Sequence, residues 1–118
     1  MTTIKANDLL DTGLSEATIN KIHSAFAKYP QIETVLLYGS RAKGTFRNGS
    51  DIDLSIKDSK VRYVDLLGLE LTLDELMTPY GFDISIFENI ENNALVEHIN
   101  RVGRVFYERS EGQTCTGG

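Results

Sequence analysis

The chain contains four short segments whose apolar and polar positions predict β-strands. Residues 33–38 form a largely apolar run, and residues 51–56 and 82–87 alternate polar with apolar side chains. Because successive side chains of a strand point to opposite faces, each alternating segment predicts one face that can be buried and one polar face. Residues 103–108 predict a short final strand or extended segment. We therefore expect a small mixed sheet of about four strands.

Segments with helical spacing of apolar residues separate these strands. Residues 16–29 place apolar side chains every three or four positions, with Ser15 as an N-cap before them and Pro30 as a stop after them. Residues 91–101 show similar spacing, and residues 40–45 predict a short helix directly after the first strand. Helices interleaved with strands predict an α/β (α+β) fold in which helices pack on the sheet.

The segment 61–77 is ambiguous between helix and strand. Leucines alternate from position 67 to position 73 as in a strand, yet Val64, Leu67 and Leu71 also fit one helix face. Its length and its content of leucine and acidic residues favour a helix that crosses over between the second and third strands. We interpret its leucines as core residues.

Carboxylates gather on the polar faces of two of the predicted strands. Asp51 and Asp53 share one face of the second strand, and Asp83 lies on the polar face of the third. Neighbouring carboxylates repel each other unless a cation lies between them, and Mg²⁺ is held by one or two carboxylates together with substrate phosphates. Three convergent carboxylates suit one or two such ions. The alternative is an edge strand that charge keeps from aggregating, which the context of the three acids disfavours.

A Gly-Ser turn ends the first strand and is suited to phosphate binding. Gly39 lets the backbone approach a phosphate closely, and Ser40 adds a hydroxyl at the start of a helix. Arg41 and Lys43, together with Arg47, crowd the loop that follows. We interpret this basic cluster as triphosphate contacts; the alternative is an ordinary solvated loop.

These motifs resemble the signature of the polymerase β-type nucleotidyltransferase superfamily. Gly39-Ser40 is followed by ten residues and then by Asp51-Ile52-Asp53, and Asp83 supplies the third acid on a later strand. The resemblance implies transfer of a nucleoside monophosphate from a nucleoside triphosphate to a hydroxyl, with release of pyrophosphate. It also implies ATP as donor and Mg²⁺ or Mn²⁺ as cofactor.

The resemblance assigns roles to seven residues. As catalytic residues and metal ligands it implies Asp51, Asp53 and Asp83. As nucleotide-binding residues it implies Gly39, Ser40, Arg41 and Lys43.

The small size is similar to the minimal branch of this superfamily, whose members pair with helical partner proteins in toxin–antitoxin modules. The resemblance implies a hetero-oligomer with a HEPN-type toxin or a substrate-binding subunit, and transfer of AMP to a partner hydroxyl, a tyrosine in the first instance. Two alternatives remain: an antitoxin that masks its partner without turnover, and a subunit that modifies a small molecule such as an aminoglycoside. Residues 1–109 are expected to form a single minimal nucleotidyltransferase domain.

Composition limits the other function classes. Seventeen acidic against twelve basic residues give a net charge of −5, which argues against direct nucleic-acid binding. We find no membrane-spanning stretch and no signal peptide, and we expect a cytoplasmic protein. The single Cys115 excludes an intramolecular disulfide and lies in a polar tail, residues 110–118, that we expect to be disordered. We expect His23 at the surface and assign no role to His98.

Overall fold

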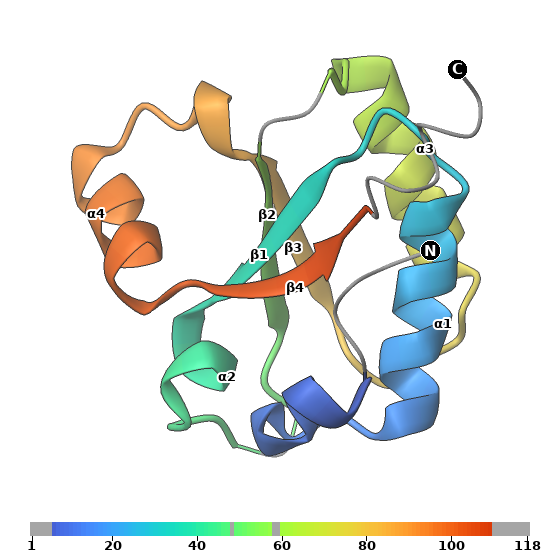
Figure 1. Cartoon of the computed structure of the whole chain (residues 1–118), viewed down its shortest axis with the longest axis vertical. Coiled ribbons are helices and arrows are strands. Elements are labelled where there is room, and N and C mark those ends of the chain that lie inside the picture. Colours follow the sequence, from blue (N-terminus) through green and yellow to red (C-terminus); the bar gives the residue numbers. More distant parts are fainter. Residues whose placement is uncertain (1–5, 48, 58–59, 110–118) are drawn as a thin grey trace.

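The structure is a computed structural model that describes residues 6–47, 49–57 and 60–109 (Figure 1). Asn48 and the predicted tail with Cys115 lie outside the described residues. The elements follow one another as η1 (Ala6–Thr12), α1 (Glu16–Ala27), β1 (Thr34–Tyr38), α2 (Gly39–Lys43), β2 (Ile52–Lys57), α3 (Tyr63–Asp74), β3 (Phe82–Ile86), η2 (Phe87–Asn89), α4 (Asn93–Val102) and β4 (Arg104–Glu108).

The four strands form one mixed sheet in the order β3-β2-β1-β4. β1 runs antiparallel to both β2 and β4, whereas β2 and β3 are parallel. A parallel pair needs a crossover connection, and α3 provides it between β2 and β3. The predicted fold class, a small mixed sheet with helices packed on it, is confirmed.

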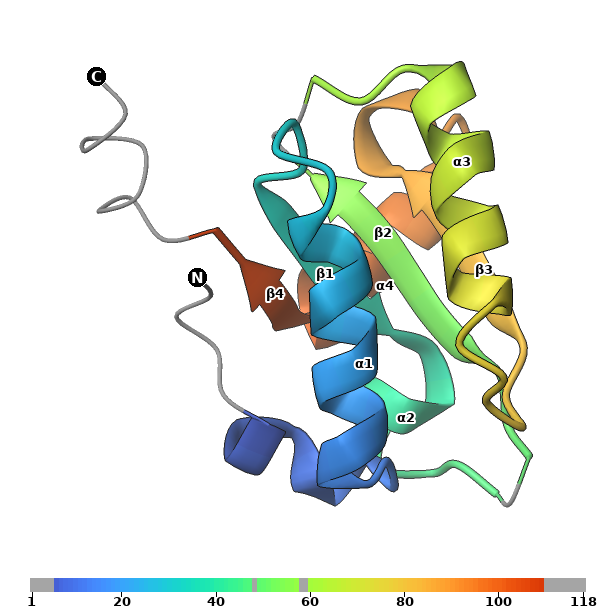
Figure 2. The same ribbon diagram turned by 90° about the vertical axis from the view of Figure 1, so that its right-hand side faces the viewer.

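Helices cover both faces of this sheet unequally. α1 and α3 lie side by side on one face and α4 lies on the other (Figures 1 and 2). The core lies under α1 and α3, where the aliphatic side chains of β2 are fully buried at Ile52, Leu54 and Ile56. The opposite face of β2 therefore presents Asp53 toward the α4 side, as its alternation predicts.

α1 begins as the sequence predicts, since the Ser15 hydroxyl accepts a hydrogen bond from the Thr18 amide. The predicted surface position of His23 is wrong: its side chain is buried, with Nε2 2.6 Å from the carbonyl oxygen of Phe106. Burial lowers the pKa of His23, and the ring packs edge-on against Phe106 and Tyr107. His23 is buried because β4, far away in the sequence, pairs with β1 and brings Phe106 and Tyr107 against the imidazole ring.

The ambiguous segment is a helix, α3, as its length predicts. Only part of it packs inward: Leu69 and Leu73 are buried, whereas Leu67 and Leu71 are exposed. The interpretation of all these leucines as core residues is therefore wrong. α3 lies beside β3, an edge strand, so the far face of the helix has nothing to pack against among the described residues.

None of the helices within residues 6–47, 49–57 and 60–109 has both the length and the apolar character that crossing a membrane requires.

Candidate active site

The sheet brings together the acids that the sequence places on separate strands. Asp53 of β2 pairs in register with Asp83 of β3, and Asp51 comes directly before β2. Asp53 is half-buried, whereas Asp51 and Asp83 are exposed. The β2 and β3 strands are neighbours, as the expected convergence of the three acids requires, and their register places Asp83 beside Asp53.

The carboxylates influence one another electrostatically. Burial raises the pKa of the Asp53 carboxyl, and the negative charges of Asp83 and Asp51 raise it further. The chain alone therefore disfavours the charged form of Asp53. A cation at this position would reverse that preference.

Two glycines make room for these side chains. A Cβ at Gly39 would lie 2.2 Å from Oδ2 of Asp53, and a Cβ at Gly81 would lie 2.7 Å from Oδ1 of Asp51. Gly39 also has φ +76°, a conformation that other residues rarely adopt. The backbone at positions 39 and 81 thus forms a cradle around the Asp53 and Asp51 carboxylates that any side chain would fill.

The donor set of this cradle fits a hard divalent cation. Carboxylate oxygens are the ligands that Mg²⁺ and Mn²⁺ prefer, and the negative charges of Asp83 and Asp51 that raise the pKa of Asp53 are ones that a bound cation would offset. Among the residues that the structure describes, however, no three acidic, histidine or cysteine side chains are gathered closely enough to hold an ion. Repulsion between like charges opposes such a gathering in the chain alone.

The Gly-Ser turn lies directly beside the acids. Tyr38 pairs in register with Asp53, and α2 begins at the next residue, Gly39. Ser40 is half-buried in the first turn of α2, and Lys43 is exposed at its end. The structure therefore places Gly39 beside Asp53, with Ser40 next to it in the chain.

Arg41 occupies a different environment from the one the sequence suggests. Its side chain is only 2% exposed; its Nε and Nη2 donate to the carbonyl oxygen of Ser50, and its Nη1 donates to that of Thr12. The guanidinium also lies 5.1 Å from the ring centre of Phe46 and 4.8 Å from that of Tyr80. It holds η1 against the loop before β2, so Arg41 is not among the nucleotide contacts that we propose below.

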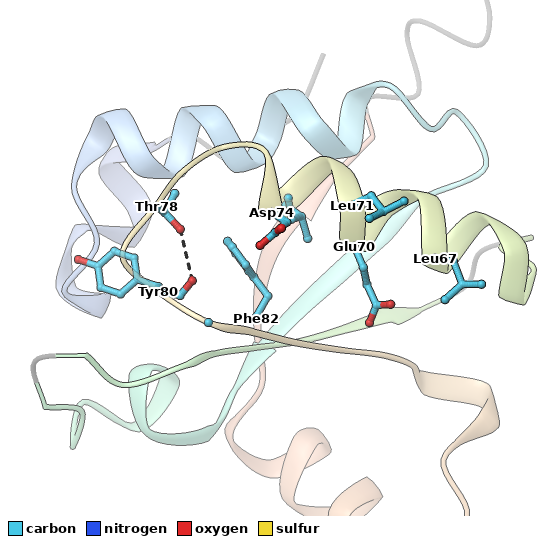
Figure 3. Close-up of a pocket in the computed structure, with 9 residues that line it drawn as sticks. Leu67, Glu70, Leu71, Asp74, Thr78, Tyr80 and Phe82 are labelled. Atoms are coloured by element: carbon cyan, nitrogen blue, oxygen red, sulfur yellow. Dashed lines mark hydrogen bonds between the residues drawn. The ribbon is translucent and has the colours of Figure 1, made fainter.

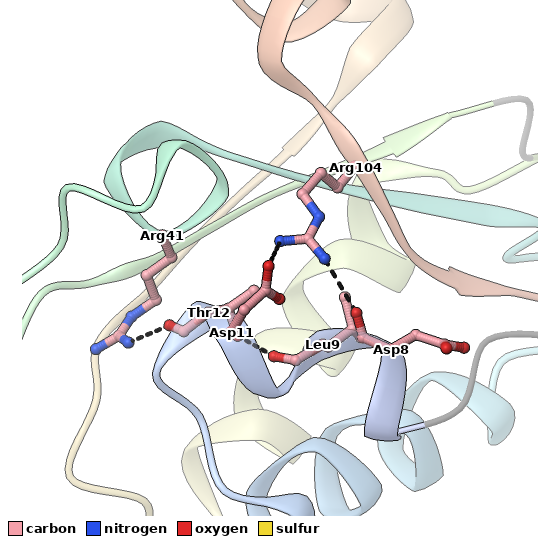
Figure 4. Close-up of polar contacts among 6 residues, drawn as sticks. All are labelled: Asp8, Leu9, Asp11, Thr12, Arg41 and Arg104. Atoms are coloured by element: carbon pink, nitrogen blue, oxygen red, sulfur yellow. Dashed lines mark hydrogen bonds and ion pairs between the residues drawn. The ribbon is translucent and has the colours of Figure 1, made fainter.

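A second arginine holds η1 from the other side. Arg104 of β4 donates to the Asp11 carboxylate and to the carbonyl oxygen of Asp8, both at 3.0 Å (Figure 4). The contacts of Arg41 and Arg104 together attach η1 to α2 and β4. The basic cluster that the sequence suggests is thus partly a set of structural contacts.

We expect Arg41→Ala to lower the free energy of unfolding by about 3 kcal/mol, because the buried carbonyl group of Thr12 and the half-buried one of Ser50 lose a charged donor and a large buried side chain disappears. The matched control is Arg47→Ala, at an exposed arginine of the loop that follows α2, which should change stability by no more than about 0.5 kcal/mol. Urea denaturation measures both. Equal stabilities for the two variants, with catalysis lost only in Arg41→Ala, would return Arg41 to the nucleotide site.

Two residues of the site are missed by sequence reasoning. Burial raises the pKa of the Tyr38 hydroxyl, a hydrogen bond to Ser85 opposes this, and Asp83 and Asp53 add to the rise. Tyr38 therefore belongs to the polar cluster. Strand alternation could have indicated the face of β1 on which Tyr38 lies, but not its register opposite Asp53.

His98 is the second residue that the sequence did not identify. The Gly39 amide donates to His98 Nε2 at 3.3 Å, and the imidazole ring packs edge-on against Tyr38. The His98 side chain, which projects from α4, thus accepts the hydrogen bond of the Gly39 amide in the Gly-Ser turn. No local pattern indicates this contact, because it depends on where α4 docks.

The paired aspartates, the Gly-Ser turn and the mixed sheet indicate a nucleotidyltransferase. The chain matches the family described as "Polymerase beta, Nucleotidyltransferase" over residues 20–112, which is more than half of its length, and it belongs to this family. The resemblance seen in the sequence motifs is confirmed. A comparison with curated proteins finds no match.

Solved structures share the fold at low sequence identity. A chain from the crystal structure of a toxin–antitoxin with AMP-PNP aligns with a TM-score of 0.62 and 18% identity, over 82% of this chain and 78% of that chain. A chain from the structure of the tri-AMPylated Shewanella oneidensis HEPN toxin in complex with MNT antitoxin aligns with a TM-score of 0.59 and 14% identity, over 86% and 79%. At these identities the likeness demonstrates the fold alone.

Proposed function

We propose that this protein transfers AMP from ATP to a hydroxyl group of a helical partner protein, in a reaction that depends on Mg²⁺ or Mn²⁺. The observation that carries the proposal is the register pair Asp53–Asp83 with Gly39 fitted against the Asp53 carboxylate. A solvated edge strand has no need of a glycine shaped around one of its acids. The raised pKa of Asp53 also marks a site that a cation would complete.

The residues divide the work of the reaction. An oxygen of the acceptor hydroxyl attacks the α-phosphorus of ATP, the bond from that phosphorus to the bridging oxygen of the β-phosphate breaks, and pyrophosphate leaves. Asp83, exposed at the edge strand, accepts the hydroxyl proton. Ser40 and Lys43 contact the phosphates, and Gly39 allows the backbone to approach them.

Asp51, Asp53 and Asp83 would hold the divalent cation, which neutralises phosphate charge and orients the triphosphate when it is bound. Mg²⁺ and Mn²⁺ both accept such oxygen ligands. No described residue distinguishes adenine from other bases, so the choice of ATP rests on the fold relatives, one of which was solved with AMP-PNP.

The partner is inferred from the same relatives. One is described as a tri-AMPylated HEPN toxin in complex with an antitoxin, and this description supports a toxin as the acceptor and a role for the present chain as the antitoxin. We take a tyrosine of the partner as the acceptor. The exposed position of Asp83 suits an acceptor that approaches from another protein.

The decisive experiment incubates the protein with the product of the neighbouring reading frame, ATP and Mg²⁺, and measures the intact mass of that product. We expect one or more added adenylates, none of them with Asp51→Ala or Asp53→Ala or in the presence of a chelator. A partner that is inhibited stoichiometrically without any mass change would establish the masking alternative. Adenylation of an aminoglycoside, with the partner unmodified, would establish the small-molecule alternative.

A further inference from the structure

The outward face of α3 carries a contiguous set of exposed apolar side chains, which we call the α3 strip. Its members are Tyr63, Val64, Leu67 and Leu71, exposed to 71%, 59%, 44% and 67%. Their spacing places all four on one face of the helix. Single exposed leucines are common on protein surfaces, but a contiguous set of large apolar residues marks an interaction site.

The strip continues into a cavity of about 500 Å³ between α3 and the segment that leads into β3 (Figure 3). Leu67 and Leu71 line it from the helix and Phe82 from the start of β3. The carboxylates of Glu70 and Asp74 also line it, and both residues are exposed. The result is an apolar groove with an acidic border.

The shape of this surface fits a helix better than a small molecule. From Tyr63 to Leu71 the strip is about 12 Å long at the rise of an α-helix. Beyond the end of α3, Met77 is 87% exposed and adopts φ +58°, an uncommon conformation for this residue. A partner helix laid along the groove would cover the strip over its whole length.

The charge of this surface indicates whether its partner is a second copy of this chain or a different protein. A second copy packed on the same surface by twofold symmetry would bring two sets of the Glu70 and Asp74 carboxylates into one interface, in a chain of net charge −5. Like charges brought together at an interface are unfavourable. The acidic border is complementary instead to lysine and arginine side chains.

We propose that the α3 strip and its groove bind an amphipathic helix of a partner protein, with leucine-type residues at helical spacing and lysine or arginine residues flanking them. The strip lies on the face of the sheet away from Asp53, since in Figure 3 α3 lies above β3 and α4 lies below it. Gly81 lines the groove and also belongs to the cradle around Asp51. The strip and the groove include none of the acids Asp51, Asp53 and Asp83, so the binding requires neither ATP nor a divalent cation and goes beyond the proposed transfer reaction.

The test uses a fluorescent synthetic peptide of about 18 residues, long enough to form a helix, with leucines on one face and lysines beside them. Fluorescence anisotropy without nucleotide or metal measures its binding. We expect the double variant Leu67→Glu/Leu71→Glu to bind at least about tenfold more weakly than the native chain. The matched control is Leu10→Glu, because Leu10 is 46% exposed but lies in η1; it should bind like the native chain.

The sign of the charge change separates apolar contact from non-specific attraction. Two added glutamates make the protein more acidic, so non-specific attraction of a lysine-rich peptide would increase in the double variant. Thermal melting verifies that the variants are folded. If the double variant is unfolded, Leu71→Gln, at the more exposed of the two leucines, replaces it. Asp53→Asn should bind the peptide like the native chain, which separates this surface from the transfer site.

Three results would overturn the proposal. The first is no binding of the peptide, or binding that the double variant does not weaken. The second is equal binding of a peptide whose flanking lysines are replaced by glutamates. The third is a dimer of the native chain in sedimentation velocity that the double variant dissociates, which would identify a second copy as the occupant.

Discussion

Asp53→Asn is expected to reduce nucleotidyl transfer by about a hundredfold or more and, in the absence of metal, to raise the melting temperature of the chain. Transfer falls because an amide is a poor ligand for the cation that the reaction needs. Stability rises because the folded chain disfavours the Asp53 charge, through burial and through the charges of Asp83 and Asp51. Asparagine keeps the size of the side chain and removes that charge.

The pH dependence of this effect has a definite sign. The pKa of Asp53 in the folded chain lies above its ordinary value of 3.8, so between these two values the folded state binds more protons than the unfolded state. The free energy of unfolding of the native chain therefore falls as the pH rises through this interval. The difference in melting temperature between variant and native chain should be small near pH 3.8 and grow to a plateau at neutral pH.

Thermal melts across this pH range, with Glu91→Gln at an exposed acid outside the site as control, test the stability arm. The intact-mass assay tests the transfer arm. A large loss of stability in Asp53→Asn would mean that the carboxylate is a structural group. A variant that transfers AMP normally would remove Asp53 from the site.

Gly39→Ala is expected to reduce nucleotidyl transfer, again by about a hundredfold or more, although it leaves every carboxylate in place. The new Cβ would lie 2.2 Å from Oδ2 of Asp53, so the carboxylate or the turn must move. The backbone conformation at φ +76° adds a cost of about 1 kcal/mol for any residue with a side chain.

Gly44→Ala separates these two effects. Gly44 has φ +82°, but nothing lies within 4 Å of a Cβ at that position. The Gly44→Ala variant should therefore lose about 1 kcal/mol of stability and keep its transfer activity to within about threefold of the native chain. Denaturation and intact-mass measurements on both variants decide the matter. If Gly39→Ala transferred as well as Gly44→Ala, the fit of Gly39 against Asp53 would have no catalytic importance.

The sequence alone determined most of the helices and strands and the polar face of each alternating strand. Strand alternation in residues 51–56 fixes which side chains point to the core, because the period of two is a local property of the backbone. The order of strands and helices and the Gly39-Ser40 and Asp51-Ile52-Asp53 motifs followed in the same way. The family membership was therefore within reach of local patterns.

The tertiary structure decided which surfaces are buried and which side chains meet. Arg41 and Lys43 are alike as sequence signals, yet Arg41 is buried against backbone carbonyl groups and Lys43 is exposed. His98 reaches the Gly39 amide only because α4 docks on β1, and His23 is buried only because β4 returns beside β1.

The exposed leucines of α3 have the same explanation. Apolar periodicity tells which residues share a helix face, but burial depends on whether another element covers that face. Leu67 and Leu71 share a face that lies beyond the edge of the sheet, whereas Leu69 and Leu73 point into the core. The sequence determined local geometry because its causes are local; the burial of each face and the contacts of the site depended on residues far apart in the chain.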